Sequence, residues 1–180
     1  MTHGHHLSPS ILLSFVQTYT RIVPSPGRIL ALDVGDRRIG LAITDALGLT
    51  AQPLFTIHRT NLRADLKSVA RFLRQHSVAM IIVGNPLHVD GSPSPQAVKA
   101  QAFAAALREA HPSLTHLLLD ERLTTQEAHA RLDAAGHSNH SAGRNARIDR
   151  RDIIDQVAAT VLLEAFLSSQ CPALLPDPDA

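Results

Sequence analysis

The chain has 180 residues, of which 44% are hydrophobic and 18% charged, so it suits one globular domain with a sizeable core. No apolar run approaches the ~20 residues that a membrane span requires. The net charge of +1 neither demands nor excludes a nucleic-acid partner. Its single cysteine, Cys171, permits no intrachain disulfide and fits a reducing cytoplasm.

The two ends of the chain are expected to lie outside the folded domain. Residues 1–27 lack the positive n-region of a signal peptide, and their apolar run Ile11–Val16 is too short for an h-region. Pro24–Gly27 then breaks the chain before the first strand. We therefore expect a flexible extension over residues 1–27, one domain over residues 28–168 and a tail over residues 169–180.

The segment Ile29–Asp45 has two apolar runs around a short polar turn, a pattern typical of a β-hairpin. Gly35 permits the backbone of the turn, and Gly40 lets another part of the chain approach closely. Asp33 is unexpected, because it stands in a run that otherwise predicts a buried strand. Its carboxylate either caps the turn or is paired with a cation, and this segment alone does not decide between the two.

Strands then alternate with helices, which predicts a mixed α/β sheet with helices on its faces. Both short apolar runs after the hairpin segment are typical of buried parallel strands. Strands are expected over Gln52–Arg59 (edge-type), Ala79–Val83 and Leu114–Leu119, and helices over Asn61–His76, Gln96–Ala110, after Thr124 or Thr125, and over Arg150–Leu167.

Three carboxylates occupy unusual places. Asp33 ends the first strand, Glu121 follows the last strand, and Asp155 heads an apolar face of the final helix. Parallel neighbouring strands would bring the first two to one edge of the sheet, and a helix packed there would add the third. Such carboxylates raise one another's pKa values unless a cation neutralises them, and oxygen-only ligands favour Mg²⁺ or Mn²⁺.

Each acid also has a simpler interpretation when it is taken alone. Glu121 could pair with a surface arginine, and Asp155, with Asp152 one turn earlier, could neutralise Arg150 and Arg151 or interact with the helix N-terminus. The joint placement favours a site, but spacing alone does not establish one.

Four motifs together resemble the YqgF (RuvX) family in order and spacing, over roughly Gly27–Leu167. The motifs are Asp33-Val34-Gly35 through Gly40, Val83-Gly84-Asn85-Pro86-Leu87 with Asp90-Gly91, Asp120-Glu121-Arg122-Leu123-Thr124, and Asp155-Gln156-Val157-Ala158-Ala159. The chain departs from the family at Asn85, where leucine is usual, and the family pattern does not cover the N-terminal extension.

The resemblance implies an RNase H-like fold related to Holliday-junction resolvases, and a cytoplasmic nuclease that matures the 5′ end of pre-16S rRNA. The family's acidic positions fall on Asp33, Glu121 and Asp155, whereas Asp152 matches none. On this hypothesis Asp33 bridges two Mg²⁺ or Mn²⁺ ions and the other two acids each complete a site. Candidate phosphate-binding arginines are Arg37, Arg38, Arg122, Arg144, Arg147, Arg150 and Arg151, which could instead form a solvated charge run.

Three other functions are considered. A resolvase of four-way DNA junctions would share the fold and favour a homodimer over a monomer. A nucleotide-binding protein is suggested by Asp33-x-Gly35-x-x-x-x-Gly40, which also looks like the phosphate loop of sugar kinases and actin, but 180 residues leave no room for their second lobe. A non-catalytic ribosome-assembly or transcription factor on a nuclease fold is the third.

Overall fold

The computed structural model describes residues 27–123 and 150–170. Most of the expected extension (residues 1–26 of 1–27), the helix expected after Thr124 or Thr125, and most of the expected tail (residues 171–180 of 169–180) lie outside the described residues. None of the described helices is long and apolar enough to cross a membrane.

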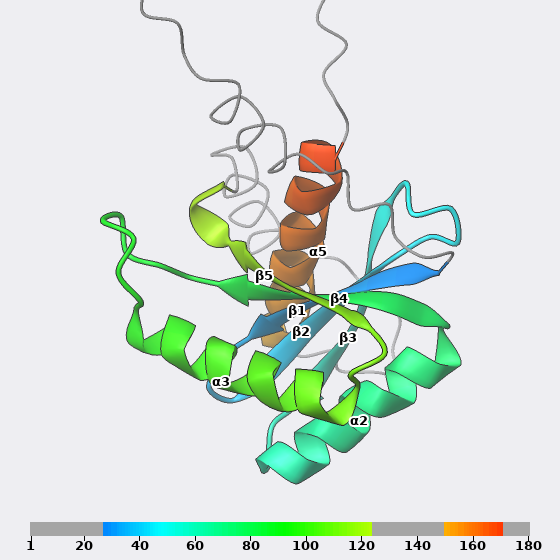
Figure 1. The fold of residues 1–180 in the computed structure, drawn as a ribbon, viewed down its shortest axis with the longest axis horizontal. Helices are drawn as coiled ribbons and strands as arrows, with labels where there is room; N and C mark the ends of the chain where they lie inside the picture. The colour runs from blue at the N-terminus through cyan, green and yellow to red at the C-terminus, as the bar shows by residue number, and fades with distance from the viewer. Residues whose placement is uncertain (1–26, 124–149, 171–180) are drawn as a thin grey trace, which may run out of the picture.

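The described residues form one five-stranded mixed sheet, as the sequence predicts (Figure 1). Its strands are β1 (Arg28–Val34), β2 (Arg38–Thr44), β3 (Ala51–His58), β4 (Val78–Asn85) and β5 (Thr115–Asp120), in the spatial order β3-β2-β1-β4-β5. The strands β1, β2 and β3 pair antiparallel, whereas β4 pairs parallel with β1 and β5 parallel with β4. The strands β1, β4 and β5 therefore run in the same direction, and their carboxyl ends lie at the same end of the sheet.

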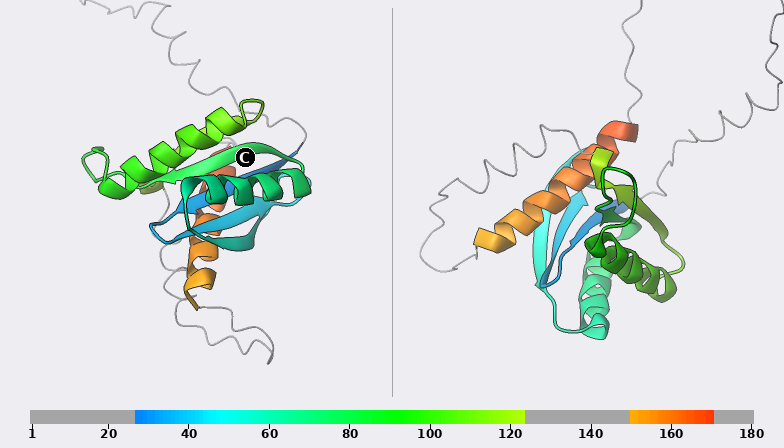
Figure 2. Two further views of the ribbon diagram at one scale, coloured as in Figure 1. Left: turned by 90° about the horizontal axis from the view of Figure 1, so that it is seen from below. Right: turned by 90° about the vertical axis from the view of Figure 1, so that its left-hand side faces the viewer.

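Helices cover both faces of this sheet (Figures 1 and 2). The helices are α2 (Leu62–Gln75), α3 (Pro95–Ala110) and α5 (Arg150–Gln170), with a short 3₁₀ turn η2 (Glu121–Leu123) after β5. The helix α5 lies against one face, across β1, β2 and β3, and α2 and α3 lie against the other.

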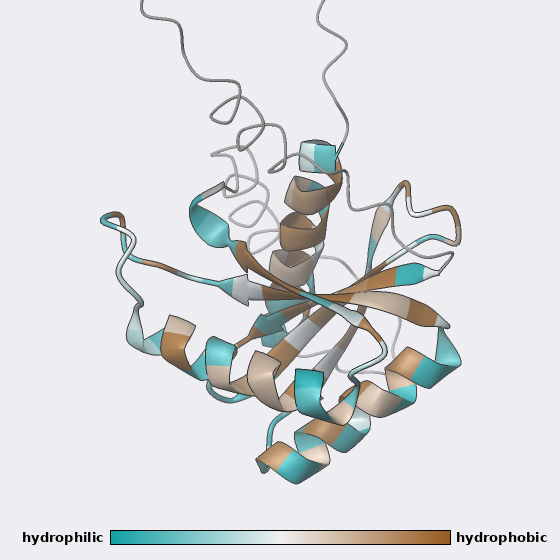
Figure 3. Ribbon diagram, viewed as in Figure 1, coloured by the Kyte–Doolittle hydropathy of each residue, from teal (hydrophilic) through white to brown (hydrophobic). Residues whose placement is uncertain are grey.

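The alternation of side chains along β1 assigns its residues to the two layers. Leu30 and Leu32 belong to the core beneath α2 and α3, whereas Ile29 and Ala31 belong to the core beneath α5. Hydropathy follows this arrangement, since brown apolar residues run along the strands in the middle of the molecule (Figure 3). The same alternation places Asp33 on the face that α5 covers.

Most predicted elements are confirmed with shifts of one to three residues at their ends. Asn61 caps α2, because its side-chain oxygen accepts a hydrogen bond from the Ala64 N–H at 3.0 Å. The expectation of a buried strand over Leu114–Leu119 is wrong in its burial. The strand β5 lies at the edge of the sheet and none of its residues is fully buried, although Leu117, Leu118 and Leu119 are apolar.

Candidate active site

The first acid of the site, Asp33, lies beside Gly40 on the neighbouring strand, because these two residues are register partners in the pairing of β1 with β2. A Cβ at Gly40 would stand closer than 3.0 Å to the backbone carbonyl oxygen of Asp155 on α5. The missing side chain therefore lets the α5 backbone rest directly on β2. This contact brings Asp155 next to Asp33, and it confirms the expected close approach at Gly40.

A second glycine clears the space for Glu121 on the other side of Asp33. Leu32 pairs with Val83 in the parallel register of β1 and β4, so Asp33 and Gly84 follow at the same level. A Cβ at Gly84 would stand closer than 3.0 Å to Glu121 Oε1. Glycines on both flanking strands thus leave room for two further carboxylates around Asp33.

Electrostatic interactions link Asp33 to each of the other two acids. Burial, and then the negative charge of Asp155, raise the pKa of Asp33 from its ordinary 3.8 to about 6. Burial, followed by the charges of Asp33 and Asp120, raises the pKa of Glu121 from 4.5 to about 7. Groups with such perturbed pKa values in partly buried positions are frequent in functional sites.

Asp155 is held by a cation of the protein itself. Arg38 Nε donates a short hydrogen bond to Asp155 Oδ2 and lies 3.9 Å from Asp152 Oδ1. Asp152 also lies 3.1 Å from His58 Nε2. Arg38 is thus placed among carboxylates at the site, where spacing had predicted only a phosphate-binding arginine. The sequence alone does not reveal these contacts, because the residues that make them lie on three different elements, β2, β3 and α5.

The donor atoms of this site suit a hard divalent cation. Asp33, Glu121 and Asp155 offer only carboxylate oxygens, the ligands that Mg²⁺ and Mn²⁺ prefer. Within the described ranges, however, no three His, Cys, Asp or Glu side chains are close enough to hold one ion together. The pairing of Asp155 with Arg38 is the contact that would have to change for all three carboxylates to share cations.

The other predicted phosphate-binding arginines fall in several places. Arg37 is exposed in the turn between β1 and β2, and Arg150 and Arg151 are exposed in the first turn of α5. Arg144 and Arg147 lie outside the described residues. A phosphate-binding role for these arginines stays a prediction.

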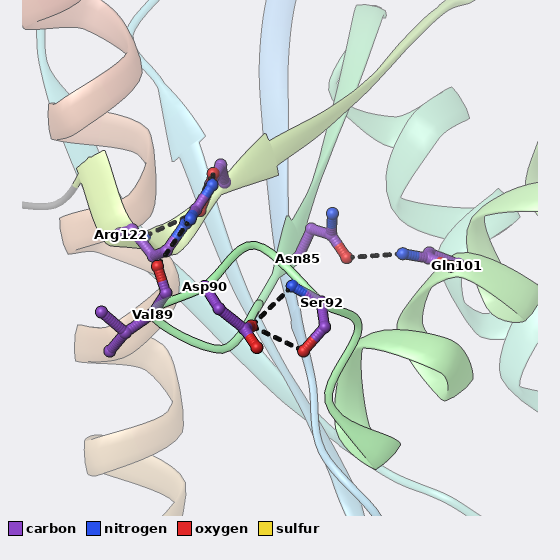
Figure 4. Close-up of polar contacts among 7 residues, drawn as sticks. Asn85, Val89, Asp90, Ser92, Gln101 and Arg122 are labelled. Atoms are coloured by element: carbon purple, nitrogen blue, oxygen red, sulfur yellow. Dashed lines mark hydrogen bonds and ion pairs between the residues drawn. The ribbon is translucent and has the colours of Figure 1, made fainter.

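Arg122 stabilises the loop between β4 and α3, as Figure 4 shows. Its guanidinium donates to both carboxylate oxygens of Asp120 at 2.6–3.0 Å and to the carbonyl oxygen of Val89 at 3.2 Å. In the loop, Asp90 Oδ1 accepts hydrogen bonds from the N–H and the hydroxyl of Ser92. The guanidinium thus links this loop to the residue that precedes Glu121, a role that the sequence does not reveal.

Comparison with known proteins gives the family. Residues 27–169 match the family model described as RuvX, Holliday junction resolvase. The chain belongs to the RuvX family. Relatives named "Putative pre-16S rRNA nuclease" include one from Myxococcus xanthus, 40% identical over 152 residues (84% of this chain and 93% of the relative), and one from Moorella thermoacetica, 44% identical over 140 residues (78% and 94%). The resemblance noted from the four motifs is therefore confirmed.

The fold of this RuvX-family chain is also found among solved structures. It superposes on Thermus thermophilus RuvC, solved in complex with a Holliday junction substrate, with a TM-score of 0.50. The sequence identity is 11%, and the match covers 79% of this chain and 96% of RuvC. At this identity the likeness shows the fold alone, and the RNase H-like fold expected from the sequence is confirmed.

Proposed function

We propose that this chain is a metal-dependent nuclease that hydrolyses a phosphodiester bond during 5′-end maturation of pre-16S rRNA. The observation that carries this proposal is that Asp33 interacts electrostatically with both Asp155 and Glu121, whose close approach Gly40 and Gly84 permit. The names of the curated relatives support the substrate. A cytoplasmic location, supported by the single cysteine, belongs to the same proposal.

In this proposal the carboxylates of Asp33, Glu121 and Asp155 would hold Mg²⁺ or Mn²⁺. Bound divalent cations would supply an activated water and stabilise the leaving oxygen. The contribution of the protein is to hold the three carboxylates on a strand, a 3₁₀ turn and a helix. Exposed arginines such as Arg37, Arg150 and Arg151 would contact the backbone phosphates of the nucleic acid.

The test is a cleavage assay on two substrates side by side, an RNA that carries a pre-16S 5′ extension and a four-way DNA junction. Wild type, Asp33→Asn and a matched control would be assayed with Mg²⁺ or Mn²⁺ and with EDTA. The control is Asp36→Asn, because Asp36 is an exposed aspartate three residues away whose carboxylate pairs with Lys99 at 2.5 Å. The RNA would also be offered within a ribosomal precursor particle.

We expect cleavage of the RNA by wild type and Asp36→Asn, and none by Asp33→Asn or in EDTA. Preferential cutting of the junction would favour a resolvase, the second candidate, which the description of the family model supports. Absence of cleavage by a folded protein on both substrates and on the particle would contradict a nuclease. It would support a nucleic-acid-binding role in ribosome assembly or transcription.

A further inference from the structure

Arg38 lies near two aspartates of α5, and it is closer to Asp155 than to Asp152, which comes one turn earlier in the helix. Arg38 Nε is hydrogen-bonded to Asp155 Oδ2 but lies 3.9 Å from Asp152 Oδ1, just beyond hydrogen-bonding distance. Residues three apart on a helix face the same side, so both carboxylates of α5 flank the one guanidinium. A movement of about 1 Å would bring Arg38 Nε within hydrogen-bonding distance of Asp152.

Asp152 has an oxygen available to receive that guanidinium. Its Oδ1 is buried and has no hydrogen-bond partner among the described residues. Buried polar atoms of native proteins are normally hydrogen-bonded, so an unpaired carboxylate oxygen calls for an explanation. The other oxygen, Oδ2, lies 3.1 Å from His58 Nε2. The oxygen without a hydrogen bond is thus the one that lies 3.9 Å from Arg38 Nε.

The backbone around Asp152 is fixed against the edge strand. Thr56 Oγ1 donates to the Asp152 carbonyl oxygen at 2.8 Å, and Gln156 Nε2 donates to Thr56 Oγ1 at 3.3 Å. These bonds tie the first turns of α5 to β3. A carboxylate on such a fixed backbone can hold a side chain in a second position without any movement of the helix.

We propose that Arg38 and a divalent cation are alternative partners of the Asp155 carboxylate, and that Asp152 is the positioning residue that accepts Arg38 when the cation binds. This inference rests on the proposed function in one respect, that Asp155 is a metal ligand. It makes Arg38 an internal competitor of the metal and gives Asp152, which matches no family acid, a definite role.

Competition of this kind raises the apparent Kd for the metal, which equals the intrinsic Kd divided by the fraction of molecules in which Asp155 is free of Arg38. Removal of the competitor should therefore strengthen binding. Removal of the acceptor should weaken binding, because the carboxylate of Asp152 is then no longer there to take Arg38 from Asp155. The weaker binding that follows removal of Asp152 should therefore occur only when Arg38 is present, and this dependence distinguishes competition from other causes.

The experiment measures the Kd for Mn²⁺ by electron paramagnetic resonance of free Mn²⁺, on the full chain without nucleic acid. We expect Arg38→Gln to bind Mn²⁺ about three to ten times more tightly than wild type, and Asp152→Asn to bind it about three times more weakly. The double variant should bind as tightly as Arg38→Gln. Asp152→Glu, which keeps the carboxylate, should restore affinity towards that of wild type.

Two controls separate competition from other causes. Arg37→Gln removes a charge from the adjacent exposed residue and should leave the Kd unchanged, whereas a general charge effect would tighten it as well. Circular dichroism melting curves of all variants establish that each is folded, and Arg38→Lys replaces Arg38→Gln if the latter does not fold. Since lysine lacks the planar fork, we expect it to compete less and to bind Mn²⁺ more tightly than wild type.

The possible failures are distinguishable. If wild type binds no Mn²⁺, or Asp155→Asn binds it as wild type does, the metal site of the proposed function is wrong and the inference fails with it. If Asp155→Asn loses binding but Arg38→Gln binds no more tightly than wild type, only the competition is overturned. Weaker binding by Asp152→Asn that persists in the double variant would identify Asp152 as a metal ligand and also overturn its role as acceptor.

Discussion

At the scale of single residues, the surroundings of Asp33 oppose the ionisation of its carboxyl group. The rise of its pKa from 3.8 to about 6 means that the folded protein holds this proton more tightly than the unfolded chain does. Stability therefore falls as the pH rises from about 4 to about 6, and the cost is fully present above that window. A negatively charged site of this kind is costly to the fold and useful for binding cations.

Asp33→Asn is accordingly expected to stabilise the protein. The shift corresponds to about 3 kcal/mol, and allowing for solvent at this partly exposed position, we expect a gain in unfolding free energy of about 2 kcal/mol near pH 8. Near pH 3 the difference should nearly vanish, because the Asp33 carboxyl is then largely protonated in both the folded and the unfolded state. Urea denaturation in EDTA at the two pH values measures both quantities.

Asp36→Asn serves as the matched control for that measurement. The pKa of Asp36 is lowered by its hydrogen bond to Lys99, so its charge favours folding and its loss should not stabilise the protein at any pH. A destabilised Asp33→Asn near pH 8 would contradict the argument, since it would mean that the ionised carboxylate has a strong partner.

The residues of the site divide into those that the sequence discloses and those that it does not. Asp33 is conspicuous because a charge interrupts an apolar strand, and Gly40 because it interrupts the next one. Arg38 looked like any other arginine of a polar turn. Its pairing with Asp155 spans 117 positions and depends on where α5 crosses β2, which no local pattern encodes.

At the scale of elements, the loop between β4 and α3 owes its position to a side chain outside it. Arg122 reaches from η2 to the Val89 carbonyl oxygen while it remains paired with Asp120 (Figure 4). Backbone bonds within the loop, such as His88 N–H to the Ser92 carbonyl oxygen at 2.9 Å, fix its internal shape but not its place relative to β5.

We expect Arg122→Ala to loosen this loop without unfolding the domain. Amide hydrogen exchange over residues 86–92 should quicken about three- to tenfold, because an exposed ion pair of this kind contributes modestly to stability. Mass spectrometry of exchanged peptides makes the measurement. Arg108→Ala, in the last turn of α3, is the control and should leave exchange in the loop unchanged; equal exchange in both variants would show that Arg122 does not hold the loop.

Most elements could be predicted because their signals are local. The Asn61 cap and the apolar spacing of α2 fix that helix almost to the residue, and Pro95 fixes the start of α3. The exposure of β5 could not be predicted in this way. An apolar run does not show whether a strand is central or at an edge, since that depends on pairing with β4 and on what lies beyond it.

At the scale of the whole molecule, the site depends on three elements that meet at one end of the sheet. Residues of β1, η2 and α5 are separated by long stretches of chain, and the order β3-β2-β1-β4-β5 brings them together. Spacing suggested that Asp33 and Glu121 would follow neighbouring strands. In fact β4 lies between β1 and β5, so Gly84 must leave the space through which the two carboxylates meet.

The two glycines should therefore respond differently to an added methyl group. In Gly40→Ala the Cβ meets the backbone of Asp155, so α5 must shift as a whole, and we expect a loss of about 3 kcal/mol in unfolding free energy. In Gly84→Ala the Cβ meets the end of the flexible Glu121 side chain and makes ordinary contact with Leu162, so the loss should stay below about 1 kcal/mol.

Both variants should bind Mn²⁺ more weakly, since each displaces one carboxylate from Asp33. Urea denaturation and Mn²⁺ binding on the same samples separate the two effects. Equal destabilisation by both substitutions would contradict this account, because it would mean that Glu121 is held as rigidly as the helix backbone; unchanged Mn²⁺ binding in Gly84→Ala would mean that Glu121 contributes no ligand.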